Sequence, residues 1–231
     1  MRLALLCTIL IARVSTPCAA QSGSVLQAAS IAENITRFHP GCHAKADLRG
    51  GDCTAAAHRL CEANYRKDSF GFVFLRDGMD VHVGCAPRAF YGEVLYSQLR
   101  EIHPSCRGQA DAQSPHCVAA VRRYCSAKQG LSGGLIQETS ATRAAVACFK
   151  ATRLETMTYS QLAPTQRGCT QASAAGQLIC VTAVAKRCRN GNQAELGLPQ
   201  EVGLRSIDAA CFPARVHVVR LLDAPGRIDG R

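Results

Sequence analysis

The sequence predicts an α+β protein of three tandem disulfide-bonded modules, each a short helix, a loop, a second helix and a β-hairpin. The first observation is that twelve cysteines fall into three sets of four, with steps of 11, then 8, then 23 or 24 residues. The second is that each set spans an alanine-rich stretch followed by alternating apolar residues. The cysteines are Cys42, Cys53, Cys61, Cys85, Cys106, Cys117, Cys125, Cys148, Cys169, Cys180, Cys188 and Cys211.

Residues 1–20 are expected to be a secretory signal peptide. Arg2 precedes an apolar run of ten residues, and small residues follow as far as Ala20. That run is shorter than the roughly 20 residues that cross a bilayer, so we expect no integral membrane segment. The remaining chain divides into modules at 24–90, 91–154 and 155–222, with a flexible tail at 223–231. We therefore expect a secreted protein, either extracellular or periplasmic.

The charge and the cysteine count restrict the partners. The formal charge falls from +10 to +8 when Arg2 and Arg13 leave with the leader, and the remaining basic residues are scattered. Such a surface attracts acidic partners weakly, and export argues against nucleic acid. An even number of cysteines in an exported chain predicts a disulfide framework rather than a metal site.

The helices are predicted from spacing and composition. Tyr96, Leu99 and His103 have helical spacing, so a short helix precedes Cys106, and its counterpart in the first module is 26–38. The second helices are predicted at 53–63, 117–128 and 180–189, where alanine is abundant. Ser114 and Pro115 form a favourable helix start.

The hairpin is clearest in the first module. Phe70, Phe72 and Phe74 alternate before an Asp-Gly pair at 77–78, and Val81 and Val83 alternate after it. In the second module the corresponding strands are 134–136 and 144–149. We interpret the phenylalanine face as a core packed against the module's helix rather than as an exposed sugar-binding platform.

Helix geometry limits the disulfide pairing. The second and third cysteines are eight residues apart on one helix, which separates them by about 12 Å along its axis. A disulfide tolerates at most about 7 Å between Cα atoms, so the second and third cysteines do not pair. Two pairings remain: first with second and third with fourth, which we favour, or first with third and second with fourth.

The sequence contains no persuasive catalytic motif, and we predict no cofactor and no metal site. It has no Gly-x-Ser-x-Gly elbow, no His-Glu-x-x-His helix and no phosphate-binding glycine loop. His39, His43, His58 and His82 lie in the first module, but no pair has ligand spacing on one element. We interpret them as surface or capping residues.

One set of charged residues recurs with the modules. Basic residues stand two positions before each third cysteine, and acidic residues recur in two of the hairpins. These weak ligand-binding candidates are Arg59, Arg123, Lys186, Glu138 and Glu201, with Leu75 in the acidic position of the first module. The favoured interpretation is an ion pair within each module, Glu138 with Arg123 and Glu201 with Lys186. The alternative is a ligand site repeated in each module.

These features favour a secreted, non-catalytic binding protein whose ligand is a glycan, a cell-surface component or a protein. Repetition of a small unit suits repeated weak contacts. A first alternative is a secreted inhibitor or effector that acts on an enzyme through one module. A second is an enzyme whose site forms between modules. No oligomeric state is predicted.

Overall fold

The computed structural model describes residues 26–31, 35–43, 48–77, 80–151, 153–191, 195–213 and 219–220. The predicted signal peptide, the tail at 223–231 and Gly78 of the predicted Asp77-Gly78 turn lie outside these residues. The described chain mixes helices with small antiparallel sheets and holds six disulfides.

Three sheets, each with its own helices, divide the chain into what we call the first, second and third units. The first contains β1 (Leu26–Ile31), α2 (Gly51–Asn64), β2 (Ser69–Asp77) and β3 (Asp80–Pro87). The second contains β4 (Phe90–Leu95), α3 (Tyr96–Ile102), α4 (Pro115–Gln129), β5 (Gly133–Thr139) and β6 (Arg143–Phe149). The third contains β7 (Arg153–Thr158), α5 (Tyr159–Leu162), α6 (Leu178–Gly191), β8 (Glu195–Val202) and β9 (Ser206–Pro213). Short 3-10 turns lie at Gln109–Asp111 and Ala172–Ala174, and a short strand, β10, at Val219–Arg220.

Each sheet begins with a strand that the sequence analysis missed. The orders are β4-β6-β5, β7-β9-β8 and β10-β1-β3-β2, so this strand always pairs with the last strand of its unit. The predicted helix at 26–38 is therefore wrong over 26–31, which form β1. In β4 and β7 only one of six residues is buried, Val94 and Met157 respectively. Such strands show almost no apolar alternation, which explains why they were not recognised.

The other predicted helices are confirmed, with small changes at their ends. α2, α4 and α6 include the predicted ranges and extend one or two residues beyond them. Ser114 caps α4 by accepting a hydrogen bond from the backbone of Cys117 at 3.3 Å. Gly130, in the left-handed region at φ 62°, ends the helix. The short helix at Tyr96 is also present, as α3.

The favoured disulfide pairing is the one observed. In every set the first cysteine is bonded to the second and the third to the fourth. In the second unit Cys106–Cys117 ties the preceding loop to the start of α4, and Cys125–Cys148 ties the same helix to β6. Each long helix is thus cross-linked to the chain on both sides of it.

A glycine allows each long helix to lie directly on its hairpin. A Cβ on Gly134 would lie 2.5 Å from the Sγ of Cys125 and 2.7 Å from Val121. At Gly71 it would lie 2.1 Å from the carbonyl oxygen of Ala57, and at Gly197 it would lie 2.5 Å from the Sγ of Cys188. Real Cβ atoms do not approach so closely, which gives a physical reason for glycine 14 residues before each fourth cysteine.

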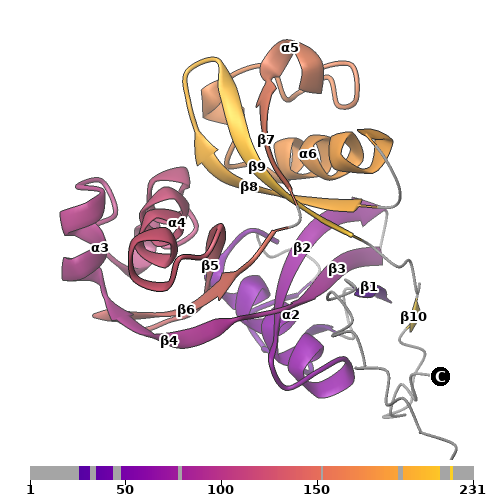
Figure 1. Ribbon diagram of the computed structural model, residues 1–231. Helices are drawn as coiled ribbons and strands as arrows, with labels where there is room; N and C mark the ends of the chain where they lie inside the picture. Colours follow the sequence, from indigo (N-terminus) through magenta and orange to yellow (C-terminus); the bar gives the residue numbers. More distant parts are fainter. Residues whose placement is uncertain are drawn as a thin grey trace, which may run out of the picture.

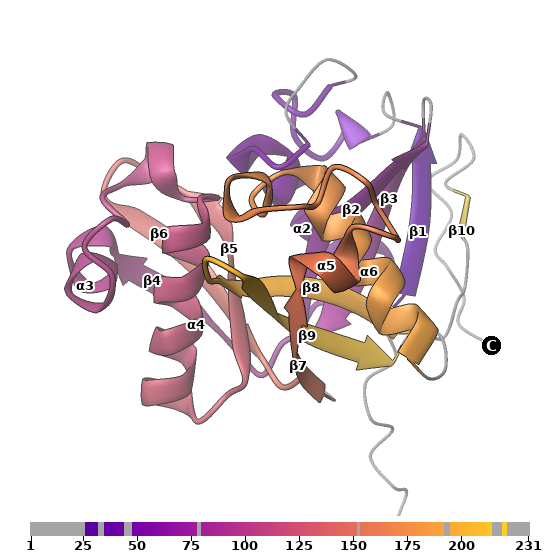
Figure 2. The ribbon, with the colours of Figure 1, turned by 90° about the horizontal axis from the view of Figure 1, so that it is seen from above.

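The three units close into a ring. α2 contacts β5 of the second unit, α4 contacts β8 of the third, and α6 contacts β2 of the first. Figure 1 shows the three helices placed around β2, β5 and β8, with each unit forming a separate lobe, and Figure 2 shows the same elements from above.

An apolar cluster fills the space between the units. Phe70 stacks on Phe149 with ring centroids 4.7 Å apart, and Phe149 meets Phe212 edge-on at 5.0 Å, so all three units contribute a ring. Phe72 and Phe74 belong to the same cluster. The phenylalanines are core residues as predicted, but they face the neighbouring units and not their own helix. Val73, on the other face of β2, packs with α2 instead.

Replacing Gly134 tests the close helix–hairpin contact. We expect Gly134→Ala to lower the free energy of unfolding by about 1–3 kcal/mol, because the added methyl group overlaps Cys125 and Val121. Gly108→Ala is the control, since a Cβ there meets nothing within 4 Å. Denaturant unfolding of the oxidised protein measures both. Equal stability of the two variants would contradict the contact.

Candidate functional site at the seams between units

Four of the five charged residues singled out by the sequence, Arg59, Arg123, Glu138 and Glu201, lie at the contacts between units, which we call seams. The first seam joins α2 to β5, the second joins α4 to β8, and the third joins α6 to β2. Equivalent positions meet at each seam, so the three can be compared directly.

A bulged residue enters each seam. The strand pairing shifts by one residue between Val73 and Leu75, between Ile136 and Glu138, and between Pro199 and Glu201. The extra residues are Phe74, Gln137 and Gln200. A bulge redirects a side chain, which here points the glutamines toward the preceding unit.

The two glutamines bond the units together through buried hydrogen bonds. The Gln137 side-chain oxygen accepts from the backbone N–H of Gly71, and that of Gln200 accepts from Gly134, both at 2.9 Å. Both side chains are fully buried. The glutamines therefore satisfy backbone donors that would otherwise lack a partner in an apolar setting.

At the first seam the ion pair joins two units. The Arg59 Nε donates to the Glu138 carboxylate at 2.8 Å, and an Arg59 Nη donates to the carbonyl of Phe38 at 3.2 Å. The predicted pairing of Glu138 with Arg123 inside one module is wrong. The hairpins of the second and third units face the helix of the preceding unit with their acidic position, so each carboxylate meets that helix's arginine.

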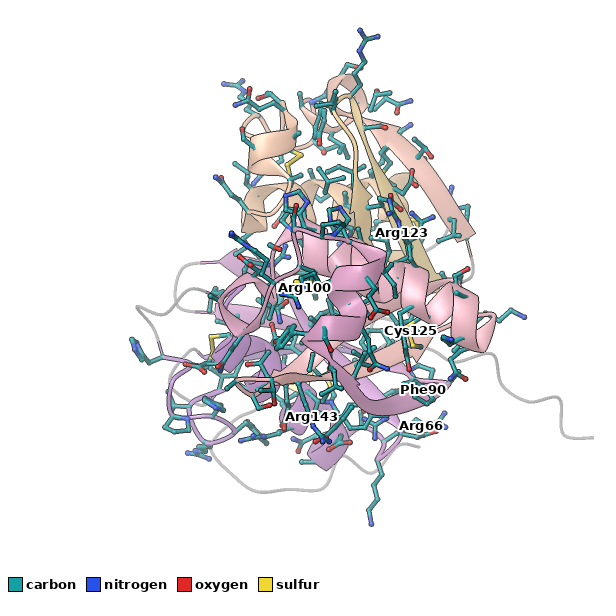
Figure 3. The ribbon with its side chains drawn as sticks, turned by 90° about the vertical axis from the view of Figure 1, so that its left-hand side faces the viewer. Arg66, Phe90, Arg100, Arg123, Cys125 and Arg143 are labelled. Carbon is teal, nitrogen blue, oxygen red and sulfur yellow. A yellow bond between two sulfur atoms is a disulfide. The ribbon has the colours of Figure 1, made fainter. Side chains whose placement is uncertain are left out.

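The second seam has the same arrangement with more charges. Arg123 pairs with Glu201, whose second oxygen lies 2.8 Å from Arg122. Arg122 also contacts Asp208 at 2.9 Å, and Asp208 accepts a hydrogen bond from Thr156 at 2.7 Å. Figure 3 shows Arg123 on α4 where the helix faces the strands of the third unit. The predicted Glu201–Lys186 pair is therefore also wrong.

The third seam lacks both interactions. Phe74 and Leu75 occupy the positions that hold glutamine and glutamate in the other units. The seam is closed instead by Thr182, whose hydroxyl donates to the carbonyl of Phe74 at 2.8 Å. Lys186 is exposed, and its ammonium group has no hydrogen-bond or ion-pair partner among the described residues.

The first seam holds an additional aromatic cluster. The Tyr91 ring stacks with His58 at 5.1 Å between centroids, and the Arg88 guanidinium lies 4.1 Å from the centre of the Tyr91 ring. Arg88 also pairs with Glu62 at 2.8 Å. Burial raises the pKa of Tyr91 to about 12 and lowers the pKa of His58. These residues have no equivalents in the other units, so the repeat pattern did not indicate them.

Two small hollows in the described part of the chain lie near the N-terminal ends of the long helices. Arg49 lines both, with Pro199 and Gln200 in one and Gln113 and Thr54 in the other. Their volumes are about 10 and 20 Å³. Such spaces hold about one water each, whereas sites for small organic ligands enclose roughly 300–1,000 Å³. Neither hollow is a small-molecule site.

Three further findings concern the described residues only. No group of three or more histidine, cysteine, aspartate or glutamate side chains is placed to hold a metal ion. No helix there combines the length and the apolar character needed to span a membrane. All twelve cysteines of the three sets are in disulfides, so none of them is available as a nucleophile.

Comparison of the chain with protein-family models, with curated proteins and with solved structures finds no match. The seams are therefore interpreted from their own geometry. That geometry assigns Arg59, Arg123, Glu138 and Glu201 to contacts between units and leaves Lys186 without such a contact.

Paired substitutions separate the two kinds of seam contact. We expect Gln200→Ala to lower the free energy of unfolding by about 1–3 kcal/mol, because it leaves the buried Gly134 N–H without an acceptor. Glu201→Ala should cost about 1 kcal/mol or less, because its arginine partners remain partly in solvent. Denaturant unfolding measures both, and Gln129→Ala on the exposed part of α4 is the control. A Glu201→Ala variant as destabilised as Gln200→Ala would show that the ion pairs hold the seam.

His58 should make stability depend on pH. Burial lowers its pKa below the usual 6.5, against an opposing effect of Glu62. The unfolded chain therefore binds this proton more readily than the folded chain. Stability is full above pH 6.5 and declines as the pH falls from there toward the pKa of the folded state. Unfolding measured between pH 7.5 and 5 should show this decline in the native protein and a smaller one in His58→Gln; an identical decline in both would refute the assignment.

Proposed function

We propose that this chain is a secreted, non-catalytic binding protein made of three tandem copies of one module, at 24–90, 91–154 and 155–222, after a signal peptide at 1–20. The six disulfides support an oxidising, extracellular or periplasmic location. The common order of strands, long helix and disulfides in the three units supports tandem copies.

The observation that carries the proposal is where the repeated charges lie. Four of the five candidate residues, Arg59, Arg123, Glu138 and Glu201, hold units together. The two hollows are too small for an organic substrate. We place the contact with a ligand on the outer surface of the ring, where cross-linked units hold their surfaces at constant spacing. Constant spacing favours a partner that presents repeated groups, such as a glycan or a cell surface.

A binding screen on the intact, oxidised protein tests the proposal. We expect retention on at least one class of extracellular glycan or surface, and loss of retention once the disulfides are reduced. The double variant Glu138→Ala with Glu201→Ala should keep its binding, since these carboxylates hold seams. A folded double variant without binding would instead identify a ligand site repeated in the modules. Inhibition of an enzyme at equimolar amounts, with no retention on any surface, would favour the inhibitor alternative.

A further inference from the structure

The outer surface of α6 carries a cluster of basic side chains that have no acidic partner among the described residues. Lys186 and Arg189 are exposed and Arg187 is half-buried. None of the three has a hydrogen-bond or ion-pair partner for its charged group among the described residues. We call Lys186, Arg187 and Arg189 the α6 basic cluster.

The cluster is distinguished by comparison with the other long helices. Lys186 occupies the position of Arg59 and Arg123, both of which are paired across a seam. Its own acidic partner is replaced by Leu75. Like α4, α6 contains no aspartate or glutamate, but Arg122 and Arg123 of α4 are paired with carboxylates of the third unit. The third seam thus leaves positive charge at the surface where the first two seams neutralise it.

Helix geometry brings these charges together. Residues three apart lie on neighbouring turns of one face, so Lys186 and Arg189 are adjacent, and Arg187 borders them. The rise between Lys186 and Arg189 is about 4.5 Å along the axis. Separate anionic groups on one extended chain can contact both side chains at once.

The surroundings of the cluster favour an acidic glycan over other polyanions. Among the residues of α6 with a described exposure, only Lys186 and Arg189 are exposed. This part of the helix therefore has no exposed apolar side chain that could insert into a lipid bilayer. The helix contains no aromatic residue on which a nucleic-acid base could stack. We infer that the α6 basic cluster binds a linear glycan bearing sulfate or carboxylate groups, which names the ligand class of the proposed binding function and rests on it.

Charge-matched variants of the full chain test this inference. One variant replaces Lys186, Arg187 and Arg189 by alanine. The control replaces Arg100, Lys128 and Lys150, which are also exposed and without charged partners among the described residues but lie apart in the second unit and just after it; Figure 3 shows Arg100 on that unit. Both variants lose three positive charges. Unfolding midpoints confirm that each is folded before binding is measured.

The binding assay uses immobilised heparin with increasing salt. The native protein should bind weakly and elute at modest ionic strength, because few charges are involved. We expect the α6 variant to bind at least about tenfold more weakly than the native protein, and the control less than about threefold more weakly. Removing three clustered charges weakens binding at one site more than removing three scattered charges does. Inorganic sulfate at matched ionic strength should not displace the protein better than chloride does, because one anion cannot bridge the cluster.

Several outcomes would overturn the inference. Equal losses in the two variants would assign the binding to net charge, and specific displacement by sulfate would indicate a site for a single anion. Equal, α6-dependent binding to phosphatidylserine vesicles would indicate a membrane surface. Absence of heparin binding by the native protein would also refute the inference that the α6 basic cluster binds an acidic glycan. Retention on a neutral glycan, unaffected by the α6 substitutions, would in that case leave the proposed binding function standing.

Discussion

The apolar cluster between the three hairpins is the contact on which the rest of the structure depends. One long helix covers only one face of each small sheet, and the other face must be buried elsewhere. Each hairpin buries that second face against the other two, as the contacts of Phe70 with Phe149 and Phe212 show. A unit of this size buries little surface by itself. The shared cluster and the two disulfides in each unit together make up for that deficit.

The seams follow from this shared burial. Once the hairpins meet, the bulged residue of one strand lies against the backbone of the preceding unit, where an apolar interior penalises any unmatched N–H. Gln137 and Gln200 supply the acceptors, and the neighbouring Glu138 and Glu201 meet arginines at the edge of the same contact. In the first unit a phenylalanine and a leucine replace these two residues. The third seam is then held through apolar packing and Thr182, and Lys186 has no charged partner among the described residues.

The candidate residues were recognisable from the sequence, but their partners were not. Arg59, Arg123, Lys186, Glu138 and Glu201 stand out because they recur in step with the cysteines. The sequence analysis favours pairing within a module. The observed pair of Arg59 and Glu138 is 79 residues apart. His58, Arg88 and Tyr91 could not be found in this way at all, because their cluster occurs at one seam only and leaves no periodic signal.

The sequence by itself determined the features that depend on local spacing. The eight-residue step between the second and third cysteines put both on one helix and excluded a bond between them, and alternating apolar residues marked the hairpins. Only the tertiary structure decided which face of each hairpin packs against its own helix and which face packs against the neighbouring units. The tertiary structure also decided that the segments at β4 and β7, which each bury only one residue, form strands. Those choices arise from contacts between residues far apart in the chain, whose energies depend on how whole units pack and not on any local pattern.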